Sequence, residues 1–446
     1  MGVVLFCVYI INSKISNVKR RVLIFVIFHK KITFHFERTV KCVIFLYEIK
    51  FLATENFMAY TVYLKKNEEK EFIGGKTWVF ANEVYKIEGK DKNGSLAVVR
   101  SFDGKFIGKG YINHLSKILV RLFIFSDIED DRRLFSERIA YADDMRRKYL
   151  ADDCYRVVFS ENDYLPGLII DRFSDVLSAQ FLTLGMNNKK DVIIDCLKEI
   201  FSPRAIIERS DAQVRTKEGL EPFKGVIYGE NVERARISEN GLLIDVDLLG
   251  GQKTGYFLDQ KLNRLSIRRF SKDKIVLDCF SNVGGFALNA GMAGAKKVYA
   301  LDVSEKAVSD IKHNALINGL KNVEAVCCDV FEKLREYKSD GKTFDMIILD
   351  PPAFCKSANE IQNAYKGYKD VNILAMKLLN KGGILVSSSC THFMTETLFK
   401  KMLSESSRSA GRRAKLLEQR IQCLDHPSLL TEDESAYLKF FILQID

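Results

Sequence analysis

The chain has 446 residues, a formal net charge of +10 and an apolar fraction of 47%. This length allows two or three domains, and the ordinary composition excludes a disordered or fibrous chain. The charge gives little evidence for nucleic-acid binding, because more than half of the excess comes from residues 1–57. The 10 cysteines include no CxxC pair and no zinc-type spacing. This argues against a disulfide framework and indicates reduced thiols in a cytoplasmic protein.

Residues 1–57 differ in character from the rest of the chain. Their apolar run, 22–28, is far shorter than the roughly 20 residues that span a bilayer, and Arg20, Arg21, Lys30 and Lys31 flank it. No signal-peptide cleavage pattern follows it. We interpret residues 1–57 as a non-conforming N-terminal extension that lies upstream of the actual start at Met58. A segment that associates peripherally with membranes is the alternative.

Residues 58–128 are predicted to form a small antiparallel β-barrel. Short stretches rich in β-branched and aromatic residues alternate there with Gly-containing turns. The predicted strands are 61–64, 77–80, 96–99 and 118–120. A central α+β domain is expected over 129–240. It opens with a helix over 129–150, acidic at its start and basic at its end, and continues with strands at 155–159 and 168–171.

From residue 241 to 446 the pattern changes to alternating strands and helices. Apolar runs that predict buried strands are 275–277, 297–300, 323–326, 346–349 and 383–387. Helical segments, such as 304–318, separate them. This alternation predicts a doubly wound, Rossmann-like α/β domain, whose ligands bind at the carboxyl ends of the strands.

The first of these strands ends in Asp278 and leads into the loop Cys279–Phe286. The glycine spacing of a dinucleotide site is absent, which disfavours a nicotinamide dehydrogenase. A carboxylate here suits the ammonium group of an amino-acid moiety, Asp302 suits ribose hydroxyls, and Asp329 could accept from an adenine amino group. Carboxylates on three consecutive strand ends predict S-adenosylmethionine (SAM); helix-capping aspartates are the alternative. The predicted cofactor set from these strand ends is Asp278, Phe280, Asn282, Gly284, Asp302, Asp329 and Asp350.

The reacting site is expected where the next two strands end. Asp350 opens the turn Asp-Pro-Pro-Ala-Phe, which suits a flat nucleobase, and Cys390 ends the run Ser-Ser-Ser-Cys. A thiolate that adds to carbon 6 of a pyrimidine makes carbon 5 nucleophilic, and Asp350 would hold the base edge meanwhile. Methylation of a ring or exocyclic nitrogen would need no cysteine and remains the alternative. Cys355 could assist proton removal or be incidental, and Cys279 is expected to serve packing.

Taken together, these residues resemble the bacterial large-subunit ribosomal RNA cytosine-C5 methyltransferases that carry an N-terminal PUA domain. The resemblance covers nearly the whole chain from about Met58. In the catalytic domain it rests on Lys253–Gln260, Asp278–Phe286, Leu301–Ser304, Asn314, Asn318–Leu320, Leu349–Phe354, Ser389–Cys390 and His426–Pro427. Upstream it rests on Trp78–Phe80, Gly167–Phe173, Arg209–Asp211 and Lys217–Gly219.

The resemblance implies an RNA-docking PUA domain, a central domain beside the substrate cleft, and a SAM domain with Cys390 as nucleophile. It also implies that Thr254 and Phe257 border the cofactor. Large-subunit ribosomal RNA is the expected partner, with no metal and no membrane, and a homodimer is left open. A non-catalytic RNA-binding assembly factor is a further alternative. Basic residues that could contact RNA, or simply face solvent, are Lys105, Lys109, Lys117, Arg121, Arg209, Arg215 and Lys217.

Overall fold

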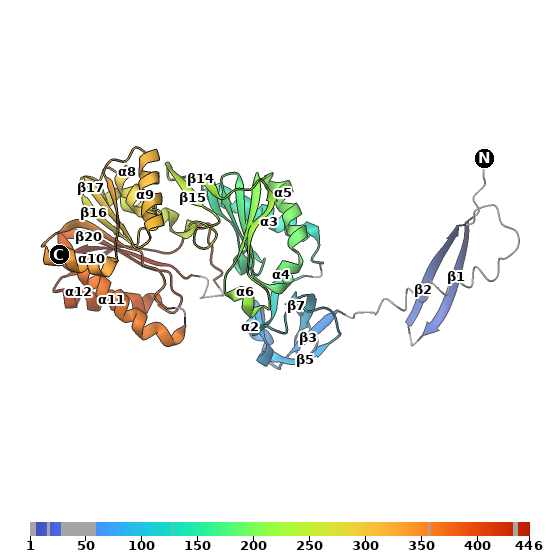
Figure 1. Cartoon of the computed structure of the whole chain (residues 1–446). Helices are drawn as coiled ribbons and strands as arrows, with labels where there is room; N and C mark the ends of the chain where they lie inside the picture. Colours follow the sequence, from blue (N-terminus) through green and yellow to red (C-terminus); the bar gives the residue numbers. More distant parts are fainter. Residues whose placement is uncertain (1–5, 16–17, 28–58, 127, 356, 431–435) are drawn as a thin grey trace. The chain divides into compact units, whose positions relative to one another are not determined.

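The computed structural model describes residues 6–15, 18–27, 59–126, 128–355, 357–430 and 436–446 (Figure 1). The chain separates into two compact units, Met1–Met58 and Ala59–Asp446. The described part of the first unit is an antiparallel hairpin of β1 (Phe6–Ile15) and β2 (Val18–Ile27). The predicted start at Met58 lies outside the described residues.

The second unit begins with a six-stranded sheet, in the order β4-β8-β7-β6-β3-β5. Its elements are β3 (Tyr60–Leu64), α2 (Glu69–Ile73), β4 (Trp78–Phe80), β5 (Val84–Glu88), β6 (Leu96–Arg100), β7 (Phe106–Ile112) and β8 (Ile118–Ile124). The four predicted strands are confirmed. The prediction of a purely antiparallel barrel is wrong for one pair, because β3 runs parallel to β6. Strand β7 was missed because it carries two glycines; a side chain at Gly110 would collide with the backbone of Arg121 on β8.

A five-stranded sheet follows, in the order β13-β12-β11-β10-β9. Its elements are α3 (Arg132–Tyr149), β9 (Cys154–Phe159), β10 (Leu168–Phe173), β11 (Val176–Phe181), α4 (Leu184–Asn188), α5 (Lys190–Phe201), β12 (Ala205–Ser210), α6 (Val214–Lys217) and β13 (Phe223–Gly229). The predicted helix and both predicted strands of this region are confirmed. Helix α3 begins where the Asp131 carboxylate accepts a hydrogen bond from the Leu134 amide.

The hairpin of β14 (Arg234–Glu239) and β15 (Leu242–Asp247) connects this sheet to the last one. One buried apolar cluster contains residues from all three parts, among them Phe173 of β10, Ile237 of β14 and Leu288 of α8 (Gly285–Met292). This shared core holds the central sheet against the C-terminal domain. The domain borders expected at 58, 129 and 241 stay predictions.

The C-terminal sheet has seven strands in the order β18-β17-β16-β19-β20-β22-β21. The strands are β16 (Ile275–Cys279), β17 (Lys297–Asp302), β18 (Val323–Cys327), β19 (Phe344–Leu349), β20 (Leu379–Ser389), β21 (Ala414–Arg420) and β22 (Lys439–Ile445). The first five in the order are parallel, and β22 is antiparallel to both of its neighbours. All five predicted strands are confirmed, whereas β21 and β22 were not predicted.

Helices cover both faces of this sheet (Figure 1). They are α7 (Lys261–Ser266), α8, α9 (Glu305–Ile317), α10 (Val330–Ser339), α11 (Ile361–Leu378) and α12 (Glu396–Ala410). Two buried apolar clusters lie between helices and sheet, one on each face. The architecture is a small β-domain, a central α+β region and a Rossmann-like α/β domain, as predicted. The carboxyl ends of five parallel strands therefore meet at one edge of the sheet, where ligands bind in such folds.

Candidate active site

The loop after β16 has a backbone shaped for close approach of a ligand. Phe280, Asn282 and Gly284 have φ angles of 64°, 52° and 88°, in the left-handed region that non-glycine residues seldom adopt. Strained backbone of this kind clusters at binding sites. The Asp302 carboxylate, at the end of neighbouring β17, holds the loop by accepting a hydrogen bond from the Asn282 amide at 2.9 Å.

Asp278 has one oxygen satisfied and one without a partner. Its side chain is fully buried, and its Oδ2 accepts a hydrogen bond from the Ala287 amide of α8 at 3.0 Å. Its Oδ1 has no hydrogen-bond partner among the described residues. Burial raises the pKa of this carboxyl to about 8, and the charge of Asp350 acts in the same direction. A buried acceptor without a donor is costly, so this site fits the ammonium group of a bound amino-acid moiety.

The other two strand-end aspartates already make local hydrogen bonds. Besides the Asn282 amide, Asp302 accepts from the Ser304 amide at 2.9 Å. Asp329 is exposed and caps helix α10, where its Oδ1 accepts from the Glu332 amide at 2.9 Å. These bonds leave lone pairs on both carboxylates, so they do not decide between a helix cap and a cofactor contact.

Three half-buried aromatic rings lie beside the loop. Phe280 contacts Phe331 and Phe354 edge to face, with ring centroids 6.3 and 6.5 Å apart. Such rings suit a flat heterocycle. Phe331 comes from the first turn of α10, and no sequence motif had singled it out.

Asp350 lies directly after β19 and is held by two side chains. Its Oδ1 accepts from Gln260 Nε2 at 3.0 Å and from the hydroxyl of Ser388 on β20. Burial raises the pKa of Asp350, while the Ser388 hydrogen bond opposes this. Neither holding residue was predicted individually, although Gln260 belongs to one of the motifs behind the resemblance. The arrangement fixes one face of the carboxyl group and leaves Oδ2 for a ligand.

Cys390 follows β20, the neighbour of β19 in the sheet. Leu349 is level with Ser387 in the parallel register, so the two strands deliver Asp350 and Cys390 to the same edge. Cys390 as a residue is intermediate in exposure, neither fully buried nor open to solvent. Burial raises its pKa and the carboxylates of Asp350 and Asp259 add to this, whereas Lys253 and Lys439 lower it. Formation of a thiolate at this position thus depends on nearby cations.

A polar cluster from several segments borders the cysteine. Asp259 is buried and its Oδ2 accepts from Tyr437 Oη at 2.6 Å and from Lys253 Nζ at 3.3 Å. The Lys253 ammonium also lies 4.5 Å from the centroid of the half-buried Phe257 ring. None of Lys253, Asp259 and Tyr437 was predicted as a site residue. Their shared feature, a charge or hydroxyl beside Cys390, appears only when the chain is folded.

Thr254 is completely buried and faces the central domain. Its hydroxyl donates to Asp171 Oδ2 at 2.5 Å. The same carboxylate accepts from Nε and Nη2 of Arg156, each at 2.8 Å. The hydroxyl therefore joins the motif to β10. That Thr254 and Phe257 border the cofactor stays a prediction.

Cys279 and Cys355, which the sequence also singled out, have other partners. Cys279 is fully buried in an apolar cluster, which confirms its expected role in packing. Cys355 is buried and its thiol donates to the Ser357 carbonyl at 2.8 Å. The Cys355 carbonyl in turn accepts from Thr391 Oγ1 at 3.1 Å, so the turns that carry Cys355 and Cys390 are tied together.

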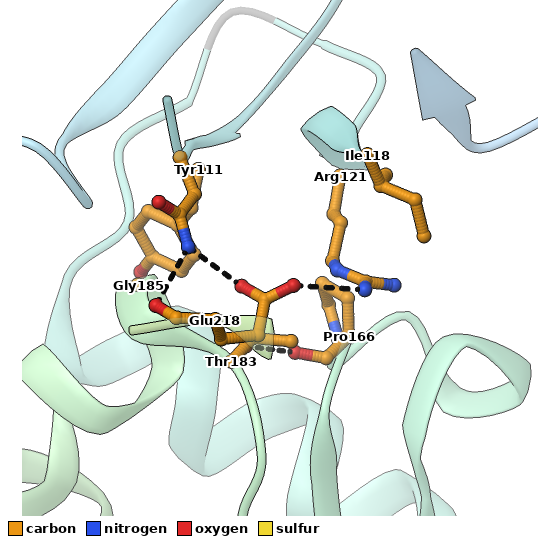
Figure 2. A pocket seen from close by; sticks show the side chains of 8 residues that line it. Tyr111, Ile118, Arg121, Pro166, Thr183, Gly185 and Glu218 are labelled. Atoms are coloured by element: carbon orange, nitrogen blue, oxygen red, sulfur yellow. Dashed lines mark hydrogen bonds and ion pairs between the residues drawn. The ribbon is translucent and has the colours of Figure 1, made fainter. Parts of the chain in front are cut away.

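For four of the seven basic residues that could contact RNA, the structure contradicts the prediction. Figure 2 shows Arg121 bound to the Glu218 carboxylate, and its other amino group pairs with Glu161 at 2.9 Å. Lys109, Arg209 and Arg215 are buried and donate to backbone carbonyls or carboxylates. These four residues stabilise the fold, so the prediction is wrong for them. Exposed members of the set are Lys105, Lys117 and Lys217.

The ranges that the structure describes contain no helix that is both long and apolar enough to cross a membrane. Nor do they contain a group of three or more His, Cys, Asp or Glu side chains placed to hold a metal ion.

Comparison with known proteins places the chain among methyltransferases. Residues 220–439 match the family model of S-adenosylmethionine-dependent methyltransferases, and residues 62–125 match that of a PUA-like domain. The fold is similar to that of a SAM-dependent methyltransferase from Streptococcus mutans, with a TM-score of 0.73, 22% identity and coverage of 86% of this chain and 99% of that one. The chain is thus a SAM-dependent methyltransferase, as the strand-end carboxylates predicted.

Closer relatives cover almost all of this chain after its first unit. Ribosomal RNA large subunit methyltransferase I of Vibrio cholerae is 39% identical over 396 residues, which is 87% of this chain and 100% of the relative. The protein of the same name from Tolumonas auensis is 40% identical over 395 residues, with coverage of 87% and 100%. This confirms the resemblance derived from the motifs. The chain belongs to the ribosomal RNA large subunit methyltransferase I family.

Proposed function

We propose that this enzyme methylates carbon 5 of a cytosine in large-subunit ribosomal RNA through a covalent bond to Cys390. The name of the relatives supports the RNA substrate, and the PUA-like domain suits RNA docking. One observation carries the choice of carbon 5: Asp350 and Cys390 lie at the ends of adjacent parallel strands, and Cys390 is not fully buried. Methylation of a base nitrogen would not require the Cys390 thiol.

The proposed cofactor contacts use the unpaired oxygen of Asp278 and the lone pairs that remain on Asp302 and Asp329. Asp278 Oδ1 would accept from the SAM ammonium group, and Asp302 from the ribose hydroxyls. Asp329 would accept from the adenine amino group, whose ring would lie near Phe280 in the loop formed with Asn282 and Gly284. SAM supplies an electrophilic methyl group on its sulfonium.

Cys390 performs the covalent step. Its thiolate adds to carbon 6 of the cytosine, and the electron pair displaced from the ring double bond makes carbon 5 nucleophilic. Carbon 5 then takes the methyl group, a base removes the carbon 5 proton, and the returning electron pair expels the thiolate. The thiol is therefore regenerated in each turnover.

Asp350 positions the base during this addition. Its Oδ1 is occupied by Gln260 and Ser388, so Oδ2 faces ring N3 and the amino group. Because burial raises the pKa of Asp350, this carboxyl group takes up a proton more readily than a free aspartate does and can then donate to N3 as negative charge develops there. A donor fixed by two hydrogen bonds costs no reorganisation during the reaction.

Replacing Cys390 by Ala tests the covalent mechanism. C390A should lose methylation of ribosomal RNA and should fail to form a stable protein–RNA adduct on RNA that contains 5-fluorocytosine. The wild type should form that adduct, because fluorine at carbon 5 cannot leave as a proton. C196A, in helix α5 of the central domain, is the matched control and should retain both properties. Full methylation by C390A would refute the proposal and favour a base-nitrogen methyltransferase.

Two further expectations accompany the proposal. Its RNA substrate would place the enzyme in the cytoplasm. A homodimer stays a prediction, which sedimentation of the purified chain at several concentrations would test.

A further inference from the structure

Lys439 is a buried ionisable group that the mechanism above does not use. It is the first residue of β22, level with Ser389 of β20 in the antiparallel register, and 6% of its surface is exposed. Its Nζ donates to the Thr391 carbonyl at 2.5 Å and to the Tyr437 carbonyl at 2.6 Å. These bonds hold the amine beside the turn that begins with Cys390.

Among the residues that the structure describes, no carboxylate contributes to the charge environment of Lys439. The ionisable group that acts on it is the Cys390 thiol. Burying an ammonium without a counter-charge is costly, so such an amine is neutral unless an anion forms next to it. The nucleophile itself is the anion available here.

The hydrogen bonds of Lys439 suit a proton acceptor. A neutral amine has two N–H groups and one lone pair. The Thr391 and Tyr437 carbonyls use both N–H groups, which leaves the lone pair for an incoming proton. Burial lowers the pKa of Lys439 to about 8, close to the range in which a base works at neutral pH.

Building on the proposed function, we propose that Lys439 accepts the proton of the Cys390 thiol and that the resulting ammonium stabilises the attacking thiolate. The S–H bond breaks, its electron pair stays on sulfur, and the proton forms a third N–H bond on Lys439. When the thiolate later leaves carbon 6 it returns to the same ion pair. The carbon 5 proton leaves through a different base.

Other charged groups also face the thiol. Lys253 lowers the pKa of Cys390, and Asp350 and Asp259 raise it. The Lys253 side chain, however, is 43% exposed and its ammonium already pairs with Asp259, so solvent and the carboxylate weaken its effect. Tyr437 donates to the same carboxylate and is protonated at neutral pH. Lys439 is the buried amine of this group.

The pH dependence of Cys390 alkylation tests the proposal directly. The full-length protein is treated with iodoacetamide from pH 5 to 10, and the modified peptides are quantified by mass spectrometry. K439Q removes the charge and keeps two amide N–H donors. We expect the midpoint for Cys390 to rise by about one pH unit or more, and alkylation at pH 7 to slow about tenfold. The exposed Cys327 is the internal control, and its midpoint should not change.

K439R is the second variant, because its guanidinium keeps a cation beside Cys390. Its Cys390 midpoint should stay at or below that of the wild type. If K439Q folds and its Cys390 alkylation midpoint is unchanged, the inference is overturned. If K439Q does not fold, a raised Cys390 midpoint in K439R overturns it. The acid limb of the methylation pH profile should move up in K439Q by the same amount as the thiol midpoint. If C390A retained methylation, the proposed function would fail, whatever the thiol titrations gave.

Discussion

Cofactor binding should depend on pH through Asp278, because this carboxyl must lose a proton before it pairs with an ammonium group. Burial and the charge of Asp350 raise its pKa to about 8. The free protein therefore holds Asp278 mainly as the neutral acid at pH 6–7. Ionising it costs about 1.4 kcal/mol for each pH unit below the pKa. SAM affinity should thus fall about tenfold per unit as the pH drops from 7.5 to 6.

Isothermal titration calorimetry of SAM binding measures both parts of this prediction. At pH 6.5, titrations in two buffers with different ionisation enthalpies should show release of close to one proton. D278N should bind SAM more weakly and lose the pH dependence. D302N, in the same site, should weaken binding but keep the slope. An affinity for the wild type that is constant from pH 6 to 7.5 would refute the reasoning, as would an unchanged slope in D278N.

Two substitutions test the supports of the site. Q260M removes one hydrogen bond to Asp350 and should lower kcat/KM for RNA methylation about tenfold or more. SAM affinity, measured by calorimetry, should not change, and unaltered kcat/KM would contradict the positioning role. E239Q leaves the buried Arg264 without its bidentate carboxylate partner and should lower the free energy of unfolding in urea by about 3–5 kcal/mol. The double variant E239M/R264M should recover most of this loss, and equal instability of both variants would argue against an unpaired charge as the cause.

The strands and helices of the C-terminal domain were predictable because their signals are local. Buried parallel strands read as short apolar runs, and the five predicted ones correspond to β16, β17, β18, β19 and β20. Strand β22 escaped, although it is almost entirely buried. It pairs antiparallel with β20. The alternation of strands and helices that predicts parallel strands therefore does not predict β22, and its position becomes clear only in the folded sheet.

The basic residues show where local reading fails. Lys109 and Lys105 look equivalent in the sequence, yet Lys109 is buried with its amine on the Ile128 carbonyl and Lys105 is exposed. Arg121 spans two carboxylates from a different domain region. Whether a basic side chain meets solvent or a carboxylate depends on contacts between segments far apart in the chain, which composition does not encode.

The order of residues in this protein predicts the class of fold and points to the proposed cofactor loop and to the two side chains proposed to react, because strand periodicity and strand-end motifs are local properties. Folding alone decided what surrounds those side chains. Gln260 and Ser388 donate hydrogen bonds to Asp350, and Lys439 donates one to the Thr391 carbonyl next to Cys390. In each pair the two residues lie dozens of positions apart in the sequence. The reactivity of a thiol or carboxyl depends on charge and burial within a few ångströms, and those neighbours are set by packing in three dimensions.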